Sequence, residues 1–581
     1  MATIEYTSAG TLPRTGRPWL SGLAARLASR GLPGLVGVVL VLPLLMLLLN
    51  SVNVAPAGQA FRYGLGNWQA AVADPSALGA LWNSFALAVV RTAISLPIAL
   101  ALTWLIARTN MPGRGVIEVL AWLSIFVPVL PLAFGWILLL DPKFGLLNTL
   151  IGSVTGSKSA IFDIYGFWGI IWVHLASTSV AYKVVLLAPA FRRINAATEQ
   201  AARVCGATAW QTATRVTLPL LAPAILLVTV ISLVLSFESF EVELLLGQPV
   251  HLYVYSTRIY DLVNNQPSNV GEATAMAVIF LVWLLLLTFL YRRAIGGRSF
   301  TTVTGREYAS RPAQLGRWRW VALGVCVAYF VATLAAPLTL LVVGSLMRLY
   351  GFFAVANPYT VAHWQELFAD PAFVAGVRNS LIVAGSASLV TMVLYSMLAY
   401  ALLRFRSPLL RVVDALVWAP WAVPGVLMSL ALLWLFLATP LRSVLYGSVG
   451  GIAVAFVFRA APLSTQFFKT SLLQIGPEVE EAARTCGAGW ARMYLKVVAP
   501  MLGPTAITVG LITFLSAVYD ISTPVLLYNA GSRPLSILML EYSFSGARER
   551  GAAIGVLLTA GVLIMLLAAR ALGYRLSRER L

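Results

Sequence analysis

The chain has 581 residues, of which 59% are hydrophobic and 11% are charged. A soluble domain carries about 25% charged residues, so this composition excludes a soluble protein and predicts an integral membrane protein. A net charge of +19 would suit a nucleic-acid-binding protein. However, the basic residues lie in short segments between apolar runs, which is typical of membrane topology and not of nucleic-acid binding.

Apolar runs of about 20 residues recur along the chain, and each is long enough to cross a hydrocarbon core as a helix. The first run is expected to be an uncleaved span rather than a signal peptide. Together the runs predict an all-α membrane protein of about 12 transmembrane helices. The predicted spans are residues 32–53, 82–107, 116–140, 165–190, 218–240, 273–291, 320–345, 379–403, 412–437, 447–468, 498–518 and 551–570.

The distribution of basic residues predicts the orientation of these spans. With the N-terminus inside, about two thirds of the 41 Lys and Arg residues fall in cytoplasmic segments, as the positive-inside rule requires. We therefore expect a multi-pass protein with both termini in the cytoplasm. Its three cysteines are too few for a disulfide framework.

The second half of the chain repeats the first. Asn83-Ser84 opens the second span, and Asn379-Ser380 opens the eighth span 296 positions later. At the same offset, LAWLSIFVPVLP matches LVWAPWAVPGVL. Each half therefore holds six spans, and the halves are parallel repeats. We expect the paired Asn and Ser residues to be helix N-caps, with a role in a transport pathway as the alternative.

A polar loop is also repeated, between the fourth and fifth spans of each half. It reads EQAARVCGATAWQTATRVTLP from residue 199 and EEAARTCGAGWARMYLKVVAP from residue 480. Ala-Ala-Arg favours a helix, Gly206 and Gly487 permit a sharp change of direction, and a proline can start the next span. The pattern predicts an L-shaped amphipathic element in the cytoplasm. In the second copy we expect Glu480, Glu481, Arg484 and Arg492 to face water or a partner.

These loops resemble the signature of the inner-membrane permeases of binding-protein-dependent ABC importers. That signature is Glu-Ala-Ala, three residues, Gly, then about nine residues and an apolar-Pro ending. The first copy departs from it, because Gln200 stands at the acidic position and Glu199 precedes it. The resemblance implies an ATPase-coupling role for Glu199, Gln200, Ala201, Ala202, Gly206, Pro219, Glu480, Glu481, Ala482, Ala483, Gly487 and Pro500.

The resemblance also implies the architecture and the partners. It implies a type I ABC importer permease fold in the bacterial inner membrane, two copies of a separate ABC ATPase, a soluble substrate-binding protein and surrounding lipid, with no nucleic acid. GSVTGSKS has the wrong spacing for a P-loop, so we expect no catalytic residues and no cofactor on this chain, with ATP and Mg on the ATPase. The expected parts are a cytoplasmic segment at 1–31, a permease half at 32–295 with its coupling loop at 195–217, a cytoplasmic linker at 296–319, a second half at 320–573 with its coupling loop at 476–497, and a cytoplasmic tail at 574–581.

The cargo is suggested by two further stretches. SFESFEVELLLGQPVHLYVYSTRIYDLV and AVYDISTPVLLYNAGSRPLSILMLEY are similar to stretches of the fused permeases of the ferric-iron importer family. The resemblance implies ferric iron as cargo. An anionic phosphorylated or phosphonate compound, thiamine or a polyamine is the alternative within the same class. An ion-coupled secondary transporter is the alternative from a different class.

Charged residues in or near the spans are candidates for the translocation pathway, because such residues are costly in a bilayer. The candidates are Arg91, Arg459, Glu238, Glu241 and Asp520. Arg459 can pair with Asp520 or Glu238 and hold the bundle together, or the arginines can attract an anionic cargo. The acidic residues can instead favour a cation such as iron, or form a docking rim. A lone intramembrane histidine without nearby Cys or carboxylate ligands predicts no metal site.

Overall fold

The computed structural model describes residues 30–55, 59–156, 159–295 and 312–578. Within these ranges the chain is helical, and its β structure is limited to isolated bridges. The chain divides into two compact units that are discontinuous in sequence. Unit one comprises residues 1–42, 386–420 and 457–514, and unit two comprises residues 43–385, 421–456 and 515–581. The predicted end segments and linker lie wholly or partly outside the described ranges.

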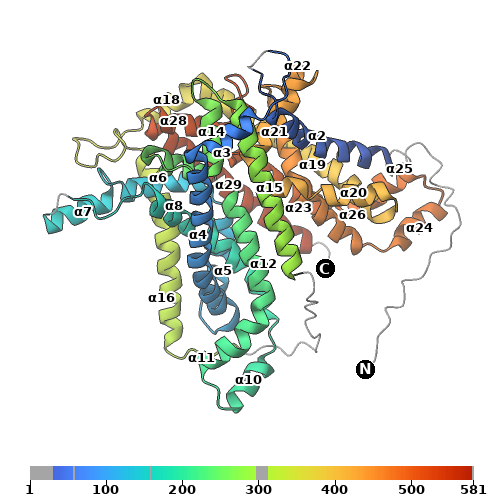
Figure 1. Ribbon diagram of the computed structural model, residues 1–581. Coiled ribbons are helices and arrows are strands. Elements are labelled where there is room, and N and C mark those ends of the chain that lie inside the picture. Colours follow the sequence, from blue (N-terminus) through green and yellow to red (C-terminus); the bar gives the residue numbers. More distant parts are fainter. Residues whose placement is uncertain (1–29, 56–58, 157–158, 296–311, 579–581) are drawn as a thin grey trace. The chain divides into compact units, whose positions relative to one another are not determined.

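The predicted spans coincide with helices of the structure (Figure 1). Within the described residues, eight helices are long and apolar enough to cross a membrane, and three bent pairs bring the number to eleven. The eight are α2 (Leu32–Ser51), α4 (Pro75–Arg108), α8 to α9 (Phe167–Arg192), α11 to α12 (Trp210–Phe237), α16 to α17 (Trp318–Ser345), α19 (Pro371–Arg404), α23 (Val449–Leu473) and α29 (Arg548–Arg578). The sixth predicted span is the apolar helix α15 (Val270–Ile295).

The third and ninth predicted spans are broken near their middle, which the sequence analysis did not predict. In the first half, α5 (Arg114–Phe126) and α6 (Val129–Leu140) meet at an angle of 100°. Pro128 lies at the break with an extended backbone, because proline lacks an N–H and disfavours helix in the residue before it. In the second half, α20 (Pro408–Leu416) and α21 (Gly425–Ala438) are separated at the matching Pro424.

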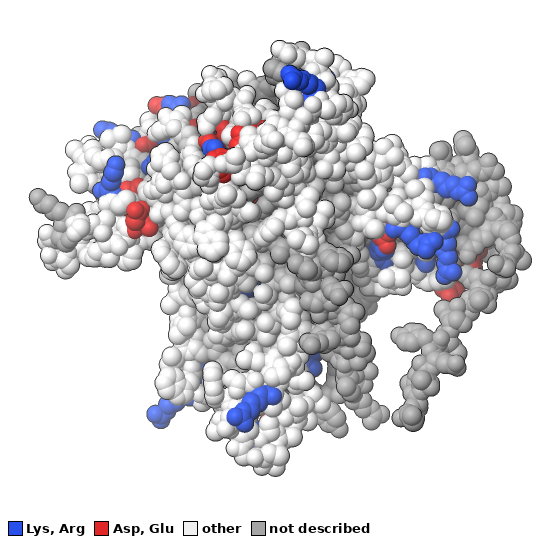
Figure 2. All heavy atoms as spheres, viewed as in Figure 1, with Lys and Arg blue, Asp and Glu red and all other residues white. Residues whose placement is uncertain are grey.

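Unit two is built around long packed helices. Helix α4 packs against α9 (Val180–Arg192) and α12 (Leu218–Phe237), while α17 (Ala336–Ser345) packs against α6 and α29. The approach of α6 to α17 requires a glycine, because a Cβ at Gly135 would lie 1.9 Å from the backbone oxygen of Pro337. In this unit, charged side chains gather around the helix ends, and the band between is almost free of charge in the view of Figure 2. That band is the predicted lipid-facing surface.

Short buried helices lie between spans five and six of each half. They are α13 (Glu241–Gly247) and α14 (Tyr255–Asn264) in the first half and α28 (Leu535–Phe544) in the second. None of the three was predicted as a separate helix. Their burial in unit two shows that these segments belong to the packed bundle and are not only surface loops.

The repeated Asn-Ser pairs position these short helices, and the prediction that they cap their own spans is wrong. Asn83 and Ser84 lie inside α4, in its third turn. The amide of Asn83 donates to the backbone oxygen of Tyr253 (3.0 Å), and the hydroxyl oxygen of Ser84 accepts from the backbone N–H of Tyr255 (2.8 Å). Tyr255 is the first residue of α14, so Ser84 satisfies one of its unpaired N–H groups.

The second half repeats this arrangement. Asn379 donates to the backbone oxygens of Gly531 (3.0 Å) and Arg533 (3.1 Å), and Ser380 accepts from the N–H of Leu535 (2.8 Å). Leu535 is the first residue of α28. Each pair therefore fixes the start of a buried helix that lies between spans five and six.

Unit one contains the C-terminal part of α19, helix α20 and the second repeated loop. Helix α20 lies against the N-terminal part of α2, where a Cβ at Gly37 would lie 3.1 Å from Val413. Within the same unit, Tyr395 of α19 donates to the backbone oxygen of Val457 (2.8 Å), and Ser388 donates to that of Gly510 (2.9 Å). These contacts hold α19 against α23 (Val449–Leu473) and α27 (Gly503–Tyr519).

Candidate functional site

The two repeated loops fold as a helix, a glycine turn and a second helix, as predicted. In the first half the helices are α10 (Ala196–Val204) and α11 (Ala209–Thr212), and in the second half they are α24 (Pro477–Thr485) and α25 (Trp490–Met493) (Figure 1). Each second helix continues through a π-helical turn into the next span, at Ala213–Thr217 and at Tyr494–Val498. The two π turns are 281 positions apart, like the glycines, so the repeat extends to the detailed backbone.

Gly206 ends α10 with a left-handed backbone (φ 86°), and Gly487 ends α24 in the same way (φ 79°). In the second loop the N–H of Gly487 donates to Arg484 (2.9 Å) and the N–H of Ala488 donates to Ala483 (3.0 Å). The first loop has the same two bonds at the same positions. This is a Schellman motif, which glycine favours because it has no Cβ. A Cβ on either glycine would meet no atom within 4 Å, so backbone conformation, not crowding, explains the glycine.

A buried carboxylate attaches the second loop to the end of α19. Glu480 is 3% exposed. It accepts from Nε of Arg404 (2.6 Å), from the hydroxyl of Tyr400 (2.8 Å) and from Arg484 (3.3 Å). Arg404 also donates to the backbone oxygen of Ile475 (2.9 Å), just before α24. Two residues from α19 therefore hold α24 at its base.

The first loop is attached to α4 in the same way. Arg108, the last residue of α4, is buried and pairs with Glu199. It also donates to the backbone oxygen of Ile194 (3.1 Å), and Glu199 accepts from Thr217 (2.8 Å) in the following π turn. Arg108 and Arg404 are equivalent in the repeat, as are Glu199 and Glu480. We refer to these two ion pairs as the coupling-helix anchors.

The anchors change the interpretation of the acidic residues in the loops. We expected Glu480 to face water or a partner, and the burial of its side chain shows that this expectation was wrong. The residues that directly follow the two anchor glutamates, Gln200 and Glu481, are exposed. The two copies therefore share the anchor glutamate, and they differ in charge at the exposed position that follows it. Two features of the sequence could have indicated the anchor. The same glutamate, Glu199 or Glu480, occurs in both copies of the loop, and an arginine, Arg108 or Arg404, ends the second span of each half.

The other motif residues lie along the same elements. Ala201 and Ala482 are exposed, and Ala202 and Ala483 each supply one of the two carbonyl groups of the Schellman motif. Pro219 is in the first turn of α12. Pro500 lies in the short helix α26 (Ala499–Met501), directly before a 72° bend into α27 (Gly503–Tyr519). The roles of these residues in coupling stay predictions.

Arg91 belongs to a buried polar cluster inside unit two. Its guanidinium donates to the hydroxyls of Ser179 (2.6 Å) and Ser239 (3.0 Å). Lys183, also fully buried, donates to the backbone oxygen of Ser179 (2.8 Å). The imidazole of His174 bonds to Glu243 at 2.8 Å. His174 is the intramembrane histidine noted in the sequence, and nothing in the sequence shows that Glu243 of α13 reaches it.

The acidic candidates lie close to the turn that follows α27. Glu241 accepts from the backbone N–H of Ile521 (3.0 Å), and Asp520 is buried and accepts from Ser522 and Thr523. The structure thus brings Glu241 and Asp520 to the same turn within unit two. The predicted pairing of Arg459 with Asp520 or Glu238 stays a prediction.

The described residues contain no group of three or more His, Cys, Asp or Glu side chains placed to hold a metal ion. Cys205 and Cys486 are exposed free thiols beside the two turn glycines, and Cys326 is buried. The P-loop look-alike, residues 152–159, begins inside the last turn of α7 (Leu146–Thr155), and its Lys158 lies outside the described ranges.

The fold and the paired loops define a multi-pass, internally duplicated transport permease. The model of the family "Binding-protein-dependent transport system inner membrane component" matches residues 93–299 and again residues 379–578. The chain therefore belongs to this family and carries its domain twice, so it is a fused ABC importer permease.

Curated relatives match along most of the chain. The probable ABC transporter permease protein y4fN of Sinorhizobium fredii is 24% identical, over 81% of this chain and 83% of the relative. The Fe(3+)-transport system permease protein FbpB 2 of Haemophilus influenzae is 22% identical, over 88% of this chain and 91% of the relative. The crystal structure of a bacterial ABC transporter for alginate import superimposes with a TM-score of 0.40 at 22% identity, covering 47% of this chain and 94% of that chain.

Proposed function

We propose that this chain forms the translocation pathway of an ATP-driven importer whose cargo is ferric iron delivered by a soluble binding protein. Relatives named as ferric transport permeases support this cargo, because they match over about 80% or more of the chain. Relatives named as sulfate and molybdate/tungstate permeases match about a third of it. An anionic cargo is therefore the less supported alternative.

We further propose that two copies of an ABC ATPase bind the α10–α11 and α24–α25 loops. The observation that carries this proposal is the pair of coupling-helix anchors. Each anchor attaches a short exposed helix to the last residue of a 34-residue helix, α4 or α19. A push on the short helix is thereby transmitted to a span that runs through the bilayer, and the opposite face of the loop stays exposed for a partner.

The proposed topology places both loops and both termini in the cytoplasm, in accordance with the positive-inside distribution of Lys and Arg. The protein would lie in the bacterial inner membrane. In this arrangement ATP and Mg bind to the separate ATPase, and this chain performs no catalysis. The segments between spans five and six would then face the binding protein, with the Asn-Ser pairs fixing their shape.

Within the pathway, Glu238, Glu241 and Asp520 are the proposed contacts of a cationic cargo. Carboxylate oxygens suit a hard cation such as ferric iron. Two of the three lie at one turn of unit two, and Arg91 lies in the separate polar cluster with Ser179 and Ser239. We assign that cluster to holding spans two and four together.

Reconstitution tests this function. The chain, its ATPase and its binding protein are placed in proteoliposomes, and uptake of ferric iron and of a phosphonate is measured with and without ATP. The proposal expects ATP-dependent iron uptake. Uptake that survives ATP depletion would support an ion-coupled transporter instead. A binding protein that prefers the phosphonate would overturn the cargo and leave the importer class intact.

A further inference from the structure

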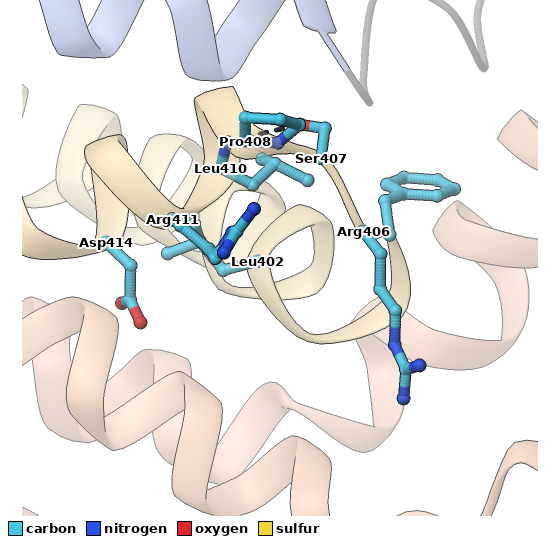
Figure 3. A pocket seen from close by; sticks show the side chains of 8 residues that line it. Leu402, Arg406, Ser407, Pro408, Leu410, Arg411 and Asp414 are labelled. Carbon is cyan, nitrogen blue, oxygen red and sulfur yellow. Dashed lines mark hydrogen bonds between the residues drawn. The ribbon is translucent and has the colours of Figure 1, made fainter.

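The elbow between α19 and α20 in unit one borders a cavity of about 500 Å³ (Figure 3). This volume lies in the range of small-ligand sites, about 300–1,000 Å³. Its lining combines the apolar side chains of Leu402, Phe405 and Leu410 with the guanidinium groups of Arg406 and Arg411. Arg406 comes from the loop that follows α19, and Arg411 comes from the first turn of α20.

The cavity is lined by two arginines and by one carboxylate that is already paired elsewhere. Arg406 and Arg411 are exposed, and among the described residues neither forms an ion pair within 4.0 Å. Asp414, the third charged residue of the lining, is engaged by Lys469 at 2.8 and 3.0 Å. An anionic ligand would therefore find two guanidinium groups whose donors are available.

The equivalent elbow of the first half is closed by its own chain. Asn110 occupies the position of Arg406 in the repeat. The backbone N–H of Asn110 donates to Ala313 (3.1 Å), its side-chain amide donates to Gln314 (2.7 Å), and its side-chain oxygen accepts from the N–H of Leu315 (3.0 Å). In the described part of the chain, the elbow of the second half has no such cover, and arginine has replaced asparagine.

We propose that this second elbow binds the headgroup of an anionic phospholipid. The planar donor fork of arginine matches a phosphate group, and basic pockets at the cytoplasmic ends of spans are places where anionic headgroups bind. Leu409 and Val412 of α20 are 41% and 55% exposed, so the same helix presents apolar side chains for the acyl chains.

The test measures lipid binding by the purified full-length chain in phosphatidylcholine nanodiscs. Phosphatidylglycerol is titrated in, and bound lipid is counted by native mass spectrometry. The variant R406Q/R411Q is expected to bind phosphatidylglycerol about 30-fold more weakly, because it loses two arginine contacts near the membrane surface. The matched control is R317Q/R319Q, which removes the same charge from two exposed positions at the start of α16 (Trp318–Phe330). The control is expected to bind like the native chain.

Several results would overturn the proposal. Equal losses in both double variants would show general charge attraction without a site. Displacement of the lipid by millimolar inorganic phosphate would show that the elbow takes a free anion. Cross-linking of the variant Arg406→Cys to residues 1–29 in the presence of phosphatidylglycerol would assign the cavity to the N-terminal segment. R406K/R411K keeps the charge and guards against misfolding, and it is expected to lose only part of the affinity. None of these measurements depends on transport activity.

Discussion

The anchor predicts different effects for the same substitution at two adjacent glutamates, the buried Glu480 and the exposed Glu481. Glu480→Gln removes a charge that is 3% exposed and that Arg404, Tyr400 and Arg484 contact directly. Hydrogen bonds to a charged group contribute about 1.5–3 kcal/mol, and removing one partner of a buried ion pair costs about 3–5 kcal/mol. Arg404 is 18% exposed, so water can solvate it in part. We therefore expect a loss of about 2–3 kcal/mol.

This loss applies to the docking of α24 on α19 rather than to the whole fold. It corresponds to an increase of about 30- to 150-fold in the undocked population of the coupling helix. Hydrogen exchange of the amides in residues 477–485 measures that population in the purified chain. The matched control is Glu481→Gln, which makes the same chemical change at the exposed neighbour. It is expected to leave exchange unchanged.

The first half provides an independent repetition of the experiment. Glu199→Gln is expected to speed exchange in α10, because Glu199 pairs with Arg108 as Glu480 pairs with Arg404. If Glu480→Gln and Glu481→Gln gave the same exchange rates, the anchor would not hold the coupling helix and the reasoning would be refuted.

Further predictions concern the turn, the exposed motif position and the Asn-Ser pair. Gly487→Ala and Gly487→Leu should each cost about 1–2 kcal/mol of loop stability from the left-handed backbone, measured by hydrogen exchange, and a much larger loss for Leu would show that crowding matters. Glu481→Lys should lower the ratio of uptake to ATP hydrolysis more than Gln200→Lys does in proteoliposomes, and equal losses would contradict the asymmetry of the two loops. Ser380→Ala leaves the N–H of Leu535 without its acceptor and should cost about 1–3 kcal/mol, seen as a lower Tm, whereas an unchanged Tm would show that the pair does not support α28.

Hydropathy and internal repetition were sufficient to predict the spans, the duplication and the helix–glycine–helix loops. These features depend on local sequence, because a span must be apolar along its whole length and a Schellman turn favours glycine. The π turns were not predicted, although they recur in the structure at the spacing of the glycines. Pro128 and Pro424 are visible in the sequence and can break a helix. Each lies inside an apolar run long enough for one straight span, so the breaks were not predicted.

Contacts between distant segments could not be predicted. The sequence places Glu480 and Glu481 side by side, and only the position of Arg404 on α19 decides which of them is buried. Asn379 and Ser380 carry the pattern of an N-cap, but the helix starts at Pro371 and the pair serves α28 instead. His174 and Glu243 meet because α8 (Phe167–His174) packs against α13, which no local pattern indicates.

The two native cysteines beside the turn glycines allow the most direct test of the central claim, that both loops face the cytoplasm and bind an ATPase. Cys205 and Cys486 are exposed, whereas Cys326 is buried and serves as an internal control. A membrane-impermeant maleimide is applied to oriented membrane vesicles with and without the ATPase. The account predicts that Cys205 and Cys486 react only in inside-out vesicles, and that bound ATPase protects both. Labelling of either cysteine from the outer side of right-side-out vesicles would contradict it.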